Sequence, residues 1–254
     1  MRALFIILLL TTSIFTSAQV SDQLTREALE DRKEFVAIPN FGLNAEDIQK
    51  NIVWAENAFS DLGFETEILP TKGNPLFFAQ KMVDPKLPTI LFYMHLDGQA
   101  VDSKKWDQPN PYKVVLKSEN ADGAYQSMPW SSIEQKVDPD WRVFGRAASD
   151  DKGPIIAFIA AMKSLQQNKQ TPAFNVKLVL DGEEEIGSKS LAAAVVKYRK
   201  KLAANALIIN DGPLHPSGKP TITFGCRGIS IIDMTVYGPV LPQHSGHYLS
   251  LIHI

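Results

Sequence analysis

Acidic residues and one histidine follow three apolar runs of the sequence, at positions where buried strands would end. His95 and Asp97 close the run "TILFYMHLD", an aspartate and three glutamates at 181–185 follow "VKLVL", and Asp211 follows "ALIIN". Like charges this close repel one another and resist burial, so either water solvates them or a positive group lies among them. Carboxylate oxygens together with an imidazole suit zinc, with manganese or cobalt as further options. The pattern therefore indicates a metal-dependent site.

A fourth acidic group, Asp150 and Asp151 in "GRAASDDKGP", comes just before a predicted helix whose first turn is marked by Pro154. In open α/β sheets, ligands bind beyond the carboxyl ends of the strands. All four groups can therefore converge on one rim of a sheet. A carboxylate shared by two ions would make a two-metal hydrolytic site at that rim.

Each group taken alone has a plainer interpretation. His95 could be a buried core histidine, and Asp150 or Asp151 could cap a helix. The glutamates could form a solvated loop or a helix N-terminus, and Asp211 could be a turn residue before Gly-Pro. Because all of these interpretations would have to hold together on the same edge of the sheet, we favour one shared site.

The alternation of side chains along a strand points His95 and Asp97 to the same side. Asp97 can then accept the second ring N–H of His95 and fix the tautomer that presents the other nitrogen to a metal. One glutamate of 183–185 that binds no metal could serve as general base toward a water molecule. The residues by themselves leave open which glutamate has which role.

The rest of the chain supplies the elements that must hold these residues. Helical spacing of apolar residues predicts one helix from 22 to Pro39 and a second between a capping Asn44 and Gly63. Apolar strands then alternate with helices in the segments 89–97, 153–168, 175–185, 190–202 and 206–212. Such alternation is typical of a mostly parallel sheet flanked by helices on both faces. The predicted fold class is α/β.

Two segments depart from this alternation. Residues 101–142, rich in proline, tryptophan, aspartate and asparagine, are predicted to leave the sheet and to line a substrate entrance. At 224–239, in "FGCRGISIIDMTVYGP", apolar residues alternate with small or polar ones, which favours a half-exposed strand. We therefore expect a catalytic domain at 19–226 and the start of a smaller α+β domain at 227–254.

The N-terminus has the pattern of an export signal that is cleaved after Ala18. Arg2 precedes an apolar stretch at 3–10, and small residues follow at 16–18. An uncleaved anchor is the alternative, but the apolar run is short for a spanning helix and serine and threonine interrupt it. We expect residues 1–18 to be removed and the protein to be periplasmic or extracellular, without stable membrane insertion. The single Cys226 cannot form an internal disulfide, so the core or a metal must stabilise the exported protein.

The composition argues against two other classes. The chain has 254 residues, 44% hydrophobic and 21% charged, with a formal net charge of -2. This balance supports a globular core and lacks the basic patch that nucleic acid requires, so no nucleic-acid partner is expected. A serine hydrolase is disfavoured because the Gly-x-Ser-x-Gly elbow is missing.

The motifs "MHLDGQAVD", "GRAASDDKGP", "DGEEEIGS", "IINDG" and "GPVLPQHSGHY" occur in one order from about residue 90 to the end. Together they resemble the di-zinc metallopeptidase family that includes carnosinase-type dipeptidases, aminoacylases, succinyl-diaminopimelate desuccinylase and glutamate carboxypeptidase. The resemblance implies a phosphorylase/hydrolase-like catalytic domain, followed by a lid or dimerisation domain. It further implies two divalent ions, preferably zinc, and hydrolysis of amide or peptide bonds in small peptides by a dipeptidase or aminopeptidase-like enzyme, with N-acyl amino acids as the alternative substrates.

The resemblance also implies which residues bind the metals. The aspartate two residues before the Lys-Gly pair would bridge the two ions, which selects Asp150 rather than Asp151. His95 and Asp211 would complete the shell of the first ion. Glu185 would bind the second ion.

The remaining implied roles are catalytic. Glu184 would be the general base and Asp97 would orient the metal-binding histidine, whereas Glu183 has no implied role. His244 would reach the active site of a partner subunit and stabilise the oxyanion, which implies a homodimer. A polar loop histidine is the alternative for His244, and His247 is close enough to compete for the role.

The last part of the sequence departs from the family pattern. The second metal also needs a histidine from near the end of a longer chain, and His253 lies in the wrong motif context. The ending "LSLIHI" is apolar where relatives continue with glycine and a polar segment. These features predict a truncated member that is inactive by itself and whose residues 249–254 are not native. A catalytically dead exported binding protein is the alternative function, although pure binding would not need a spare general base.

Overall fold

The computed structural model describes residues 21–212 and, beyond them, individual residues between 215 and 237. The chain divides into two compact units, 1–212 and 213–254. The predicted signal lies outside the described residues. The strand predicted over 224–239 is described only in part, and none of its described residues belongs to a strand. The signal and the domain boundary after 226 stay predictions.

A five-stranded sheet forms the centre of the first unit, with the strand order β1-β2-β7-β3-β8. Its strands are β1 (Glu65–Leu69), β2 (Leu76–Lys81), β3 (Thr89–His95), β7 (Asn175–Asp181) and β8 (Ala206–Ile209). The strands β7, β3 and β8 are parallel, whereas β1 and β2 form an antiparallel hairpin that joins the edge of β7. The α/β fold is therefore confirmed, with a mixed sheet whose parallel part carries the predicted strand-end residues.

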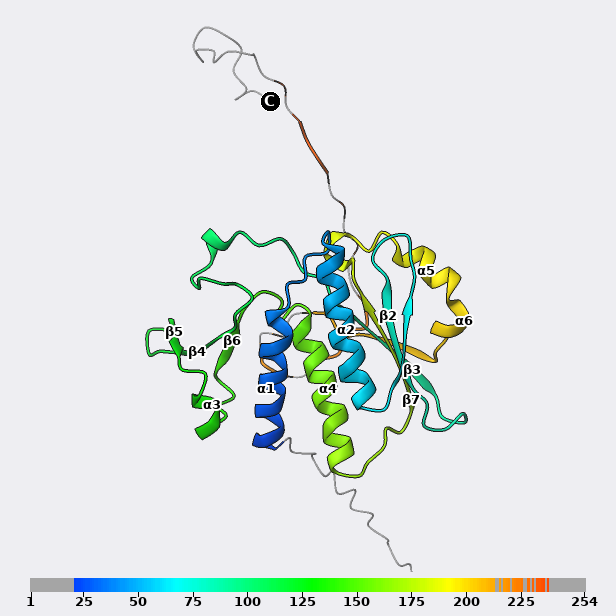
Figure 1. The fold of residues 1–254 in the computed structure, drawn as a ribbon, viewed down its shortest axis with the longest axis horizontal. Helices are drawn as coiled ribbons and strands as arrows, with labels where there is room; N and C mark the ends of the chain where they lie inside the picture. Colours follow the sequence, from blue (N-terminus) through cyan, green and yellow to red (C-terminus); the bar gives the residue numbers. More distant parts are fainter. Residues whose placement is uncertain are drawn as a thin grey trace, which may run out of the picture. The chain divides into compact units, whose positions relative to one another are not determined.

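Helices cover both faces of this sheet (Figure 1). The helices α1 (Asp22–Ala37), α2 (Ala45–Asp61) and α4 (Lys152–Gln167) lie on one face, and α5 (Leu191–Lys197) and α6 (Arg199–Leu202) lie on the other. The two predicted N-terminal helices are confirmed. The second is capped by Asn44, as expected, and Gly63 follows its end with a positive φ of 74°.

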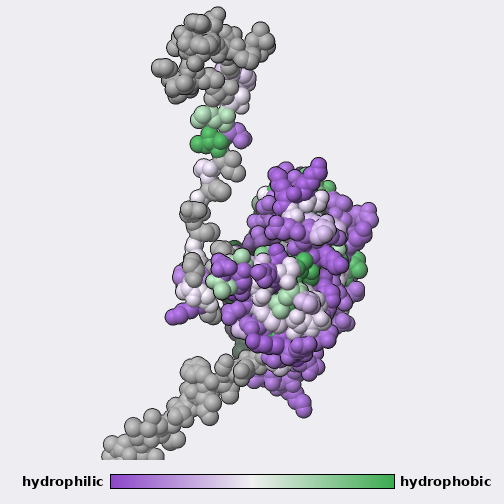
Figure 2. Space-filling model, turned by 90° about the vertical axis from the view of Figure 1, so that its left-hand side faces the viewer, coloured by the Kyte–Doolittle hydropathy of each residue, from purple (hydrophilic) through white to green (hydrophobic). Residues whose placement is uncertain are grey.

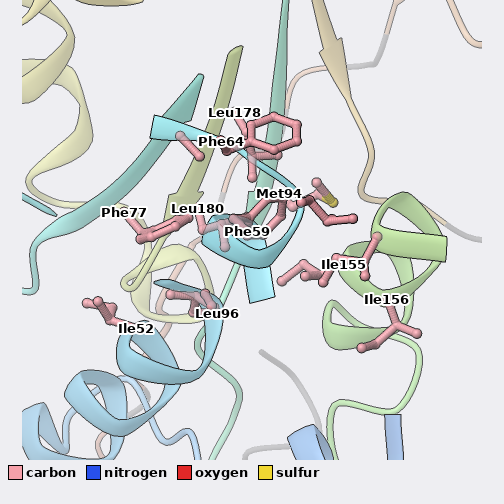
Figure 3. Close-up of a cluster of buried hydrophobic side chains, with 14 of the residues drawn as sticks. Ile52, Phe59, Phe64, Phe77, Met94, Leu96, Ile155, Ile156, Leu178 and Leu180 are labelled. Carbon is pink, nitrogen blue, oxygen red and sulfur yellow. The ribbon is translucent and has the colours of Figure 1, made fainter. Parts of the chain in front are cut away.

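The main hydrophobic core lies between the sheet and the helices α1, α2 and α4. Figure 3 shows one cluster of buried side chains that contains Phe59 of α2, Phe77 of β2, Met94 of β3, Leu178 of β7 and Leu96, which follows β3. A smaller core forms on the opposite face, where Phe78 and Val179 alternate with residues of the main core and meet α5 and α6. Successive side chains of β2, β3 and β7 point alternately to the two faces of the sheet. Because helices cover both faces, these strands are apolar almost throughout.

The segment 101–142, predicted to leave the main sheet, contributes to a second, smaller sheet. This antiparallel sheet has three strands, β4 (Val115–Glu119), β5 (Tyr125–Met128) and β6 (Arg142–Phe144), and the segment also contains the short helices η1 (Ser103–Lys105) and α3 (Ser132–Gln135). Trp130 Nε1 donates a hydrogen bond to Glu30 Oε1 of α1 at 2.5 Å, which ties the segment to the main body. That it lines a substrate entrance stays a prediction.

The surface of the first unit is predominantly hydrophilic on the face that Figure 2 shows, with small hydrophobic areas between hydrophilic residues. Among the described residues, the structure contains no helix with the length and apolar character needed to cross a bilayer.

Replacing Asn44 with alanine should lower the free energy of unfolding by about 1 kcal/mol. The Asn44 side chain accepts hydrogen bonds from the backbone N–H groups of Glu46 and Asp47, and alanine would leave the first turn of α2 without this cap. Urea unfolding measures the effect, with Asn57→Ala on the exposed part of the same helix as control. Equal stability of the two variants would contradict the capping role.

Candidate metal centre

His95 is the centre of the acidic cluster that the fold assembles. It is the last residue of β3, pairs in register with Asp181 at the end of β7, and is fully buried. Its Nε2 atom lies 2.8 Å from Asp150 Oδ1, 3.8 Å from Asp211 Oδ2 and 4.0 Å from Glu184 Oε2. Three predicted site residues from three separate loops therefore surround one ring nitrogen.

Asp97 contacts both the second ring nitrogen of His95 and the backbone of the glutamate loop. His95 Nδ1 lies 3.1 Å from the Asp97 carbonyl oxygen and 3.4 Å from its carboxylate, so the carbonyl is the closer partner for a ring N–H. The two carboxylate oxygens of Asp97 accept hydrogen bonds from the backbone N–H groups of Glu184 and Glu185, both at 3.0 Å. Asp97 therefore links the predicted metal-binding histidine to the backbone of the predicted general base.

Both aspartates of "SDDKG" reach the histidine, in different ways. The Asp150 side chain is 64% exposed and contacts the ring, whereas Asp151 is buried and its Oδ2 accepts the backbone N–H of His95 at 2.9 Å. His95, Asp151 and Asp211 each offer one ligand atom, and these atoms all lie within 4.8 Å of one another. The structure thus adds Asp151 to the residues that could contact a metal. The family motif selects its neighbour Asp150 instead.

Lys152, the next residue, does not neutralise these aspartates. Its side chain is fully buried, and its Nζ donates hydrogen bonds at 2.7 Å to the carbonyl oxygens of Phe35 and Ile38 at the end of α1. The ammonium also lies 4.4 Å from the centre of the Phe35 ring. A lysine adjacent to the acidic cluster in sequence therefore contributes to packing of α1 against α4.

The three consecutive glutamates have three different environments. Glu184 faces His95, and Glu185 Oε2 accepts a hydrogen bond from Gln99 Nε2 at 2.9 Å. Glu183 is buried and accepts hydrogen bonds from the backbone N–H groups of Asn74, in the β1–β2 loop, and of Ser190, at the end of its own loop. The 3₁₀ turn η2 (Glu184–Ile186) produces this divergence and ends at Gly187, whose φ of 91° is left-handed.

Asp181 supports the start of this glutamate loop. Its carboxylate accepts hydrogen bonds from the Tyr93 hydroxyl at 3.1 Å, the Ser188 hydroxyl at 2.8 Å and the backbone N–H of Glu183 at 3.0 Å. The last of these bonds closes an Asx turn, the common local behaviour of an aspartate before glycine. That local pattern is the signal by which sequence reasoning could have assigned Asp181 a structural role.

The electrostatics of the cluster call for a cation. Burial lowers the pKa of His95, but the hydrogen bond with Asp97 and the charges of Asp151, Asp97 and Asp211 outweigh it and raise the pKa to about 10. Burial raises the pKa of Asp151 to about 8 despite its contacts with His95, and the neighbouring carboxylates add to the rise. Burial also raises the pKa of Glu184. All three pKa values are raised because several carboxylates lie close together in a partly desolvated site.

A divalent metal ion fits this environment. Within residues 21–212, no lysine or arginine forms an ion pair with Asp150, Asp151, Glu184 or Asp211. The buried Oδ1 atom of Asp151 also has no hydrogen-bond partner among the described residues. A cation held by His95 and the surrounding carboxylates would satisfy that oxygen and offset the crowded charge. His244, His247 and His253 lie outside the described residues.

Comparison with known proteins agrees with this geometry. The chain is 29% identical over 181 residues to the Cys-Gly metallodipeptidase dug1 of Schizosaccharomyces pombe, which covers 70% of this chain and 34% of the relative. It is 28% identical over 181 residues to the Beta-Ala-His dipeptidase of Homo sapiens, covering 70% of this chain and 31% of the relative. The chain therefore spans about a third of the length of these curated relatives.

Solved structures show the same fold. An M20 family metallo-carboxypeptidase, Sso-CP2 from Sulfolobus solfataricus, matches with a TM-score of 0.61 and 31% identity over 76% of this chain and 39% of its own. Human carnosine dipeptidase 1 matches with a TM-score of 0.60 and 25% identity over 75% of this chain and 40% of its own. Residues 91–247, more than half of the chain and including the four acidic groups described above, match the model of one protein family. The chain belongs to Peptidase family M20/M25/M40.

Proposed function

We propose that this chain is the metal-binding part of a metal-dependent hydrolase that cleaves the amide bond of dipeptides. The observation that carries the proposal is the arrangement around His95 Nε2, where Asp150, Asp211 and Glu184 converge at 2.8 to 4.0 Å. Dipeptidases that act on Cys-Gly and on Beta-Ala-His are among its relatives, which supports small peptides as the substrate class.

The residues of the chain have distinct proposed tasks. A bound divalent cation would polarise the scissile carbonyl and a water molecule. His95, Asp150 and Asp211 would hold that cation, and Asp97 would orient the histidine while fixing the backbone of the glutamate loop. Glu184, partly exposed and beside His95, would remove a proton from the attacking water and return it to the leaving amine. The products would be an amine and a carboxylate.

The finer parts of the proposal concern the full metal set and the assembly. We propose two ions, with zinc as the preferred metal, Asp150 as the bridge between them and Glu185 as a ligand of the second. Carboxylate and imidazole donors support this choice. His244 would act on the active site of a second copy in a homodimer. The signal pattern at 1–18 supports export to the periplasm or the exterior.

An assay of the natural protein with a panel of substrates tests the proposed function. The metal is removed with a chelator, and zinc, manganese or cobalt is restored before dipeptides and N-acyl amino acids are supplied in parallel. We expect metal-dependent release of amino acids from dipeptides and little turnover of N-acyl amino acids. Turnover of N-acyl amino acids alone would identify a deacylase instead. Tight peptide binding without turnover under every metal would favour the exported binding protein.

A further inference from the structure

The buried carboxylate of Glu183 joins two loops that are far apart in the sequence. Its Oε1 atom accepts the backbone N–H of Asn74 at 2.9 Å, and its Oε2 atom accepts the backbone N–H of Ser190 at 3.0 Å. The residue is only 6% exposed, so neither bond competes with bulk water. Both oxygens are therefore engaged with backbone donors, which makes Glu183 a poor candidate for a metal ligand although it stands beside Glu184.

Asn74 extends the same connection to a third loop. Its side-chain Nδ2 donates to the carbonyl oxygens of Gly42 at 2.8 Å and Gly182 at 2.7 Å. One residue of the β1–β2 hairpin loop thus contacts the α1–α2 loop and the start of the glutamate loop. The close approach depends on a neighbouring glycine, because a Cβ placed on Gly73 would lie 1.7 Å from Glu183 Oε1.

These contacts hold the glutamate loop in addition to those of Asp97. Asp97 holds the backbone N–H groups of Glu184 and Glu185, while Glu183 and Asn74 hold the residues that precede and follow them. Charge-assisted hydrogen bonds from backbone donors to a buried carboxylate are strong and directional. A general base must stay within a fraction of an ångström of its productive position, so such support affects turnover.

We propose that Glu183 and Asn74 are positioning residues that set the place of the Glu184 carboxylate relative to His95. We call the hydrogen bonds that Glu183 and Asn74 make with the surrounding backbone groups the clamp. Its effect on kcat depends on the proposed hydrolase function, whereas its existence is inferred from the hydrogen bonds alone. Loss of the clamp should lower kcat by about 10–100-fold with little change in KM, as is usual when supporting hydrogen bonds of a metal site are removed. The metal content should stay that of the wild type, because neither residue binds the ion.

The test uses Glu183→Gln, Glu183→Ala and Asn74→Ala in the complete natural protein loaded with zinc. Kinetics give kcat and KM per folded molecule, elemental analysis gives the metal content, and hydrogen exchange reports on the backbone N–H groups of Asn74 and Ser190. Glu183→Gln keeps one acceptor oxygen and should retain more activity than Glu183→Ala. The exposed changes Glu65→Gln and Asn57→Ala are the matched controls and should leave all three quantities unchanged.

Hydrogen exchange separates this proposal from the function on which it rests. Faster exchange at Asn74 and Ser190 together with a lower kcat and full metal content would establish the positioning role. Loss of a metal equivalent in Glu183→Gln would overturn it, since Glu183 would then be a ligand. Faster exchange with unchanged kcat would overturn it as well, because the clamp would then be only structural. If the wild type hydrolyses no amide substrate, the proposed function fails, while the exchange data still decide whether the clamp exists.

Discussion

Replacing Glu184 with glutamine should reduce kcat by about 10²–10⁴-fold, the usual contribution of a positioned general base. Glutamine keeps the size of the side chain but cannot accept a proton from water at neutral pH. Because the backbone N–H of Glu184 donates to Asp97, the substituted side chain should stay at the same place, 4.0 Å from His95 Nε2 in the native protein. The metal content should remain that of the wild type.

Turnover and metal content must be measured on the same Glu184→Gln sample, since only their combination is informative. Glu119→Gln, an exposed glutamate of β4, is the matched control and should behave as the wild type. Loss of metal together with activity would show that Glu184 is a ligand and that the base has been assigned wrongly. The contrasting variant Glu185→Gln should lose part of the metal, because we propose Glu185 as a ligand.

Replacing Lys152 with alanine should lower the free energy of unfolding by about 3 kcal/mol. The change removes a large, fully buried side chain, opens a cavity and takes a hydrogen-bond donor from the carbonyls of Phe35 and Ile38. Burial lowers the pKa of Lys152 well below its ordinary value, which shows that the ammonium is itself costly to bury. Packing and the two hydrogen bonds must outweigh that cost.

Chemical denaturation of Lys152→Ala, Lys152→Met and Lys86→Ala separates these contributions. Methionine keeps the volume and removes the buried charge, so its cost should be smaller than that of alanine, although the two carbonyls still lose a donor. Lys86 is exposed, and its replacement should leave the stability unchanged. A Lys152→Ala protein as stable as Lys86→Ala would contradict the proposed anchoring of α1 to the start of α4.

Much of the fold follows from local patterns. The helix α2 is capped by Asn44 and ends before Gly63, as predicted, because capping and left-handed termination are decided by neighbouring residues. The parallel strands β3, β7 and β8 are recognisable in the sequence as apolar runs, as expected for strands with both faces covered. The side chains of β7 are mostly buried in this way, whereas those of β8, at the edge of the sheet, are exposed. The hairpin of β1 and β2 was not predicted, since β1 is an edge strand with mainly exposed side chains and carries no apolar run.

The sequence by itself indicated that His95, the glutamates at 183–185 and Asp211 gather at one edge of the sheet, because parallel strands place their carboxyl ends together. The aspartates before the helix at 152 were expected at the same edge, and the family motifs selected Asp150 and Glu184 among these groups. It also determined the family, through motifs whose order and spacing are visible in the chain. Only the tertiary structure decided what each acidic group contacts: Asp97 binds the backbone of the glutamate loop, and Glu183 binds a donor 109 residues away. Hydrogen bonds between loops that meet only after folding have no local pattern, so spacing along the chain cannot predict them.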